Sequence, residues 1–208
     1  FIIKIIIKLN MKFKEIICDN GGIELLLNIL VDRIGPVHQN LLYSIYDILK
    51  QLCIRNETYK LTIHQLIIKY MNNNSENEEA IKTMLKILQA TLTFIDDIRM
   101  KDGNKQHAKS SELDGHIVSN QNMDHILKLL QLGNHQVIYE LRSLCSVVLK
   151  SRGGQIILLQ SLIKLLNTSE DKNRKEYLQF AQKVVQKNIG ILTSDAKTVL
   201  NQSGVDLL

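Results

Sequence analysis

Four short apolar runs recur along this chain at a spacing near 40 residues. They read LLNIL at 26–30, IIKYM at 67–71, ILKLL at 126–130 and LIKLL at 162–166. Their starts lie 41, 59 and 36 residues apart, and the middle interval falls to about 40 if the polar stretch 101–120 is an insertion. GVDLL at 204–208 matches GIELL at 22–26 and predicts the start of a fifth unit. Self-similarity at this period is typical of stacked helical units.

Each of the four runs is followed by a polar break and then by a longer amphipathic segment. In the first of these segments, Val37, Leu41, Ile45, Ile48 and Leu52 place apolar side chains on one face at the helical period. No segment shows sustained alternation of apolar and polar residues, so we predict an all-α protein. The four long helices are predicted at about 37–53, 77–94, 136–150 and 172–188.

Short polar signals predict where individual helices begin and end. Ser75 and Glu78 have the spacing of a capping box at the start of the second long helix. Gly190 is predicted to close the fourth long helix in the left-handed conformation. The paired glycines in DNGG, 19–22, predict a sharp corner between two helices, with a positive φ at Gly22. SRGGQ, 151–155, predicts another corner, since it lacks the spacing of a phosphate-binding loop.

The segment KFKEIICDNGGIELLLNILVD, 12–32, resembles the opening of an armadillo repeat. Positions matching the family pattern are Ile16, Ile17, Gly22, Ile23, Leu26, Leu27, Ile29 and Leu30. A second corner, AKTVLNQSGVDLL, matches at Val199, Leu200, Gly204, Val205 and Leu208. The resemblance implies a right-handed α-solenoid of about four armadillo-like repeats, with a HEAT-like array as the alternative. We expect one solenoid over 1–208, a segment of a longer chain, with repeats at about 11–55, 56–97, 119–151 and 152–190, and a fifth starting at 191–208.

Composition narrows the classes of partner. Hydrophobic residues make up 45% of the chain and charged residues 23%, as expected for an ordered protein. The net charge is +5, but the lysines are spread over every segment with few aromatic residues between them, which argues against a nucleic-acid surface. The N-terminal FIIKIIIKL is too short to span a membrane and contains Lys4 and Lys8.

The cysteines Cys18, Cys53 and Cys145 are far apart and fall within apolar patterns. An odd, scattered set is typical of buried free thiols in a reducing compartment, so we expect a cytoplasmic protein. Neither a nucleophile motif nor a metal-binding spacing of histidines is found. We therefore predict no enzymatic activity, and no catalytic, cofactor-binding or metal-binding residues.

The polar stripes of the four long helices are the predicted binding surface, because these helices line the concave groove in the armadillo family. We call this set the predicted groove: Asn40, Ser44, Asp47, Gln51, Lys82, Lys86, Gln89, Thr93, Arg142, Ser146, Lys150, Gln179, Lys183 and Gln186. Import adaptors of the family clamp basic peptides with a ladder of tryptophan and asparagine. This chain has no tryptophan, has Gln51 at the first asparagine position, and carries lysines that would repel a basic peptide. We therefore expect polar or acidic protein segments as partners.

These features together predict a non-catalytic interaction scaffold within a larger multi-protein assembly. Analogy with other armadillo proteins suggests a cytoskeletal or ciliary assembly. One alternative is a cargo or transport adaptor that binds a peptide in the groove. Another is a regulatory helical domain of an enzyme whose catalytic part lies outside this segment.

Overall fold

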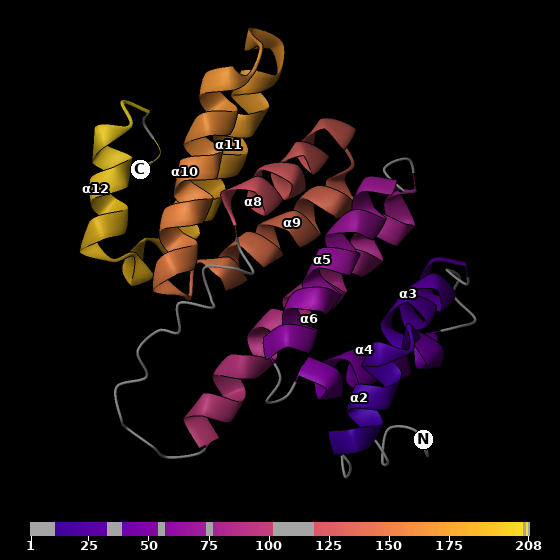
Figure 1. Ribbon diagram of the computed structural model, residues 1–208. Coiled ribbons are helices and arrows are strands. Elements are labelled where there is room, and N and C mark those ends of the chain that lie inside the picture. Colours follow the sequence, from indigo (N-terminus) through magenta and orange to yellow (C-terminus); the bar gives the residue numbers. More distant parts are fainter. Residues whose placement is uncertain are drawn as a thin grey trace. The chain divides into compact units, whose positions relative to one another are not determined.

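The computed structural model describes residues 11–32, 39–53, 57–73, 77–101, 119–205 and 207, and within these ranges it contains helices and turns but no strand. The helices follow one another along the chain as labelled in Figure 1. They are α2 (Met11–Asp19), α3 (Gly22–Asp32), α4 (Gln39–Cys53), α5 (Glu57–Asn73), α6 (Glu78–Lys101), α8 (Asn120–Leu127), η2 (Lys128–Leu132), α9 (His135–Val148), α10 (Arg152–Thr168), α11 (Asp171–Asn188), η3 (Ile189–Ile191) and α12 (Ser194–Gln202).

The all-helical fold predicted from the sequence is confirmed over the described residues. The four predicted long helices correspond to α4, α6, α9 and α11, and the largest difference is that α6 continues to Lys101. The predicted insertion at 101–120 is bounded by α6 and by Ser119, which caps α8, while 102–118 lie outside the described residues. The chain divides into two compact units, residues 1–104 and 105–208.

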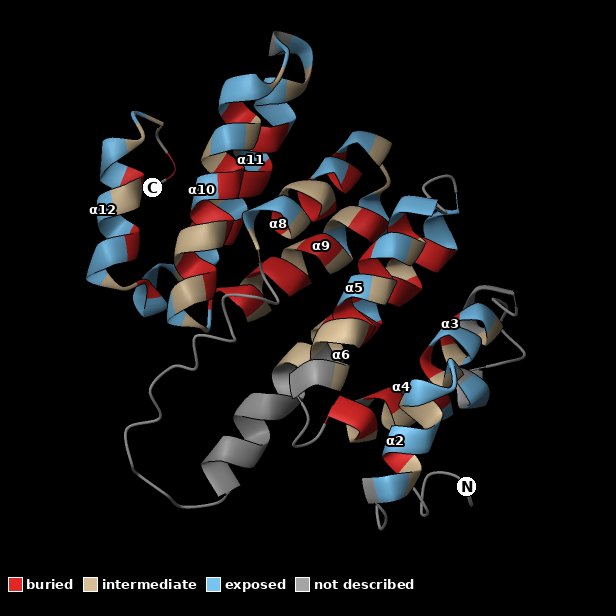
Figure 2. Cartoon of the chain, viewed as in Figure 1, coloured by how far each residue is buried: buried red, intermediate tan, exposed pale blue. Residues whose placement is uncertain are grey.

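In the first unit, helices two apart along the chain pack against each other. Helix α3 packs on α5, and α4 packs on α6, while α5 also packs on its neighbours α4 and α6. These helices have buried faces, as the red stripes in Figure 2 show, and most of the buried side chains are apolar. The largest fully buried side chains include Leu27, Leu49, Ile63, Ile67 and Leu85. Polar bonds add to this core: Lys14 Nζ donates to Gln51 O at 2.7 Å, and buried His64 Nε2 bonds Thr91 Oγ1 at 2.8 Å.

The second unit repeats this arrangement with a different set of helices. Helices α8, α10 and α12 form one layer, in which α10 packs on both of the others, and α9 packs on α11 in the second layer. Leu141, Leu158, Leu162 and Val184 are among the residues with no measurable exposure in this core. Alternation of helices between two layers is compatible with stacked helical repeats.

The described helices do not divide evenly among the predicted repeats. The described parts of 11–55 contain three helices, α2, α3 and α4. In contrast, the described parts of 56–97 and 152–190 contain two helices each, and 119–151 contains α8 and α9 joined by η2. A pair of helices per unit is typical of the HEAT-like alternative, so the described residues leave both forms of repeat open.

The corner at DNGG differs from its prediction. The positive φ belongs to Gly21, at 73°, and the expectation for Gly22 was wrong. Gly22 is the first residue of α3, and a Cβ there would lie 2.6 Å from both Ile17 O and Ile17 Cγ2. Gly22 is therefore required by the close approach of α2 to α3, and Gly21 by the backbone conformation.

Two predicted helix ends also differ from the structure. Gly190 does not hold a positive φ, because α11 runs into the 3-10 turn η3 instead of ending in a left-handed residue. At the start of α6, Ser75 lies outside the described residues, and Asn77 provides the cap, with its Oδ1 accepting from Ala80 N at 3.0 Å. Among the described residues, none of the helices is both long and apolar enough to cross a membrane.

Candidate functional site

The predicted groove residues of the first unit lie on the two packed helices α4 and α6. Ser44 and Lys86 are exposed, and the other described members of this half are half-buried: Asp47, Gln51, Lys82 and Gln89. Lys82 Nζ pairs with Glu79 Oε1 at 2.5 Å, one turn earlier on the same helix. The side chains of Asn40 and Thr93 are outside the described part of the structure.

In the second unit, two predicted groove residues take part in the packing of α9 on α11. The Arg142 guanidinium lies 5.9 Å from the centre of the Phe180 ring, a distance suited to a cation–π contact. Ser146 Oγ donates to Arg142 O at 3.1 Å and accepts from Asn188 Nδ2 at 3.2 Å. The remaining members are exposed and available to a partner: Lys150, Gln179, Lys183 and Gln186.

The structure also contains a cleft that the sequence analysis did not find. It has a volume of about 230 Å³ and lies between α8 with η2 on one side and the second half of α10 on the other. This is the layer of the second unit that the predicted groove does not include. We call it the α8–α10 cleft; its lining residues are Gln121, Asp124, His125, Leu127, Lys128, Ser161, Lys164, Leu165 and Thr168.

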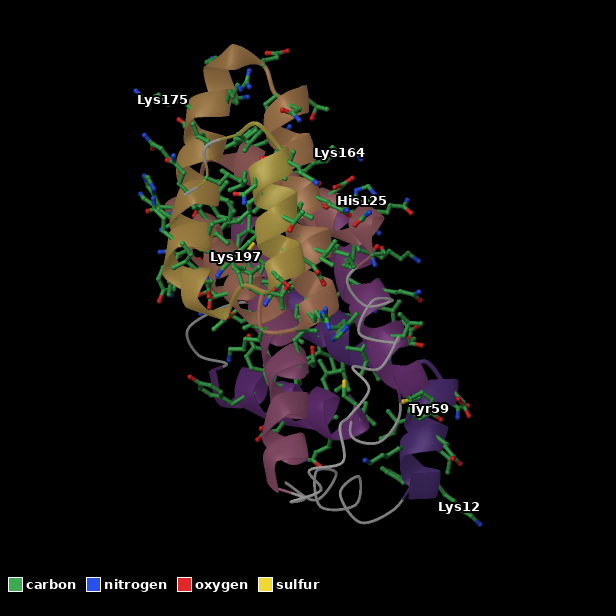
Figure 3. The ribbon with its side chains drawn as sticks, turned by 90° about the vertical axis from the view of Figure 1, so that its left-hand side faces the viewer. Lys12, Tyr59, His125, Lys164, Lys175 and Lys197 are labelled. Atoms are coloured by element: carbon green, nitrogen blue, oxygen red, sulfur yellow. The ribbon has the colours of Figure 1, made fainter. Side chains whose placement is uncertain are left out.

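An ion pair crosses the α8–α10 cleft. Lys164 Nζ lies 2.5 Å from Asp124 Oδ2, and 66% of the lysine side chain but only 21% of the aspartate side chain is exposed. Burial by itself raises the pKa of Asp124. The hydrogen bond from Lys164, the nearby Ser161 hydroxyl and the charges of Lys164 and Lys128 together outweigh burial and hold the Asp124 pKa below its ordinary value. Figure 3 labels Lys164 and His125, which belong to opposite walls of the cleft.

The depressed Asp124 pKa leads to a testable prediction for Lys164→Gln. Removing the ammonium is expected to raise the Asp124 pKa, because the main group that stabilises the carboxylate is lost. The native pair contributes stability above the ordinary aspartate pKa, and this contribution is lost as the pH falls through the lowered value. It should be under about 1 kcal/mol, since Lys164 is largely exposed.

Titration of the Asp124 side-chain ¹³C resonance would measure this shift. Lys197→Gln removes the same charge from α12 and serves as the control. An Asp124 pKa that is equal in the wild type and in Lys164→Gln would contradict the prediction.

A sequence signal for the cleft does exist. Lys128 and Lys164 occupy the same position, the third, in the runs ILKLL and LIKLL. A residue that recurs at one position of neighbouring repeats lies at equivalent places on neighbouring helices. The apolar side chains of the two runs predict the repeat, whereas the lysines at their third positions predict the positive charge of the cleft.

The cysteines are free, with Cys53 and Cys145 buried and Cys18 half-buried. Burial, assisted by the charges of Asp19 and Glu24, raises the pKa of the Cys18 thiol to about 11. Burial raises that of Cys145 to about 12. Both remain protonated at neutral pH, so neither side chain is an activated nucleophile. Within the described residues, no group of three or more His, Cys, Asp or Glu side chains is placed to hold a metal ion.

No protein-family model matches this chain, and no curated protein does. A crystal structure of an engineered protein from the Northeast Structural Genomics Consortium is similar over 99% of this chain and 86% of its own, with 15% identity and a TM-score of 0.42. A similarity at this level carries no argument about function.

Proposed function

We propose that this chain is a non-catalytic protein–protein interaction scaffold made of armadillo-like or HEAT-like helical repeats. The observation that supports the proposal most is the packing of alternate helices into two layers within each unit. Such packing buries an apolar core and leaves long polar helix faces exposed on rigid elements. A rigid surface loses little conformational entropy when a partner binds.

The exposed polar side chains on α11, together with Lys86 and Lys150, favour a partner with acidic or polar segments. Lysine and glutamine side chains donate hydrogen bonds to carboxylates and backbone carbonyls. Within this proposal, Arg142 and Ser146 hold α9 against α11, and the exposed members of the predicted groove contact the partner. We place the scaffold in a multi-protein assembly, and its cytoskeletal or ciliary setting is an analogy with other armadillo proteins.

The test is an affinity pull-down read by mass spectrometry. Replacing Lys86, Lys150 and Lys183 with Glu is expected to abolish capture of the partners, because three attractive charges become repulsive. Arg142 is left unchanged, since its loss would remove the Phe180 contact and disturb the fold. The matched control replaces Lys12, Lys69 and Lys197 with Glu, which makes the same charge change on α2, α5 and α12. Equal capture by both variants would contradict binding through the predicted groove.

A further inference from the structure

The α8–α10 cleft has the size and shape to accept a side chain rather than a cofactor. Its volume of about 230 Å³ is below the range of roughly 300–1,000 Å³ usual for small-molecule sites. Its walls belong to α8 and α10, which pack on each other in the second unit. Both helices carry buried apolar side chains: Met123 and Leu127 on α8, and Leu158 and Leu162 on α10. The polar lining residues of the cleft are therefore carried by two helices that are held together by an apolar core.

The lining carries a surplus of positive charge. Lys128 and Lys164 face one carboxylate, Asp124, and the charges of both lysines act on it. Asp124 pairs directly with Lys164 at 2.5 Å. The two ammonium groups and the single carboxylate leave one net positive charge, which matches a ligand with one negative charge.

Ser161 adds a buried polar group to the same wall. Its residue is 2% exposed, and its hydroxyl makes no hydrogen bond of ordinary geometry, although it lies close enough to Asp124 to lower the pKa of that carboxylate. Thr168 differs, because its hydroxyl donates to Lys164 O at 2.9 Å within its own helix. A buried hydroxyl without a full hydrogen bond is destabilising unless a ligand completes it.

We propose that the α8–α10 cleft binds a single carboxylate group presented by an acidic segment of a partner protein. The incoming carboxylate would bridge Lys128 and Lys164 and accept a hydrogen bond from Ser161. A carboxylate fits better than a phosphate, since one net charge is available and none of the described lining residues is an arginine that could supply a bidentate fork. The inference rests on the proposed interaction function but concerns a surface outside the predicted groove.

Asp124 acts as a built-in competitor in this site. Its carboxylate is already paired with the Lys164 ammonium in the structure. A ligand carboxylate must therefore either displace Asp124 from Lys164 or bind the same ammonium group beside it. Asp124→Asn removes the competing charge while keeping the size of the side chain. It should therefore strengthen binding, by up to about fivefold, the upper end of the range for one exposed ion pair.

The experiment is a titration of the whole chain with a capped heptapeptide that has one central glutamate. Binding is read from the side-chain resonances of ¹³C-labelled lysine, which are assigned with the Lys128→Gln and Lys164→Gln variants. The same peptide with glutamine in place of glutamate, and inorganic phosphate, are the ligand controls. The expected result is a saturable shift of the Lys128 and Lys164 resonances with the glutamate peptide alone.

Protein variants separate the cleft from general charge attraction. Replacing both Lys128 and Lys164 with Gln should weaken binding about tenfold, since two exposed charge contacts are lost. Replacing Lys175 and Lys197 with Gln makes the same charge change on α11 and α12, outside the cleft (Figure 3), and should leave binding unchanged. Equal weakening in both double variants would overturn the proposal.

Ser161→Ala gives a readout that charge alone cannot produce. It should weaken peptide binding several-fold, because one ligand hydrogen bond is lost, and should leave the melting temperature unchanged or higher, because a buried hydroxyl is removed. An affinity of Ser161→Ala for the glutamate peptide equal to that of the wild type would show that the Ser161 hydroxyl does not bind the ligand.

Three further outcomes would count against the proposal: no saturable shift of either lysine, tighter binding of phosphate than of the glutamate peptide, and no gain of affinity in Asp124→Asn. None of them affects the pull-down with the predicted groove, since that test changes no residue of the α8–α10 cleft.

Discussion

Gly154→Ala is expected to lower the free energy of unfolding by about 3 kcal/mol, as a side chain forced into a tightly packed corner does. Gly154 lies in the first turn of α10, directly after the turn that ends α9. A Cβ at this position would lie 2.4 Å from Val148 O and 2.5 Å from Ser151 Oγ. The first of these atoms is backbone, so relief requires the α9–α10 corner to open.

The corner also contains the cap of α10. Ser151 Oγ accepts from Gly154 N at 3.1 Å, and opening the corner would lengthen this bond. The loss of a helix cap adds roughly 1 kcal/mol to the destabilisation. Two effects of the substitution, steric overlap and weaker capping, therefore act in the same direction.

Gly153→Ala is the matched control, one residue earlier in the same helix. A Cβ there has no neighbouring atom within 4 Å, so alanine should be neutral or stabilising by about 0.5 kcal/mol through its higher helix propensity. Urea unfolding of the two variants followed by circular dichroism makes the comparison. Equal stability of Gly153→Ala and Gly154→Ala would mean that the corner is looser than the structure indicates.

The two glycine pairs show how far local sequence can predict a corner. The pairs in DNGG and SRGGQ both predict a turn between helices, and both lie at one: α2–α3 and α9–α10. Which glycine is essential depends on the neighbouring helix. Gly22 and Gly154 approach the carbonyls of Ile17 and Val148, and only the packed corner reveals these contacts. The assignment of positive φ to Gly22 was wrong for this reason.

The long helices were predictable, since their apolar period identifies both their length and their buried face. The contacts that each polar face makes could not be predicted in the same way. Arg142 and Ser146 follow the polar period of α9, yet α11 lies beside them and covers part of that face. The periodicity of one helix does not show which neighbouring helix will cover part of its polar face.

The α8–α10 cleft was missed for a related reason. Its walls come from residues near 124 and residues near 164, which meet only because α8 packs on α10. Asp124 and Ser161 belong to no motif along the chain. The recurrence of lysine at the third position of ILKLL and LIKLL, Lys128 and Lys164, was the signal available before the structure.

Gln155→Met is expected to lower the free energy of unfolding by about 3 to 4 kcal/mol, because it leaves three backbone groups without partners. Gln155 is 3% exposed. Its Nε2 donates to Leu149 O and to Ile191 O, each at 2.8 Å, and its Oε1 accepts from Thr193 N at 2.9 Å. One side chain on α10 therefore joins the end of α9 to the turn that leads into α12.

Methionine retains the volume of the side chain, so a loss of stability would report the hydrogen bonds rather than a cavity. The effect should be largest at α12, whose cap residue Thr193 would lose its bond to Gln155. Hydrogen exchange at the amides of Ala196 and Lys197 should be faster in the variant. Urea unfolding gives the global value, and a loss below about 1 kcal/mol would show that water replaces the missing partners.

Gln155→Glu tests the same three bonds by pH. A protonated glutamic acid keeps one donor and one acceptor, whereas the carboxylate presents only acceptors to the carbonyls of Leu149 and Ile191. Burial and these carbonyls should raise the pKa of the new side chain above its unfolded value of about 4.3. With the folded pKa raised, stability relative to the wild type is highest at low pH and falls as the pH rises through the interval between the two values. Gln155→Met has no titrating group at this position, so its deficit relative to the wild type should stay constant over that interval. If the stability deficits of Gln155→Glu and Gln155→Met changed with pH in the same way, the titrating group would lie elsewhere in the chain.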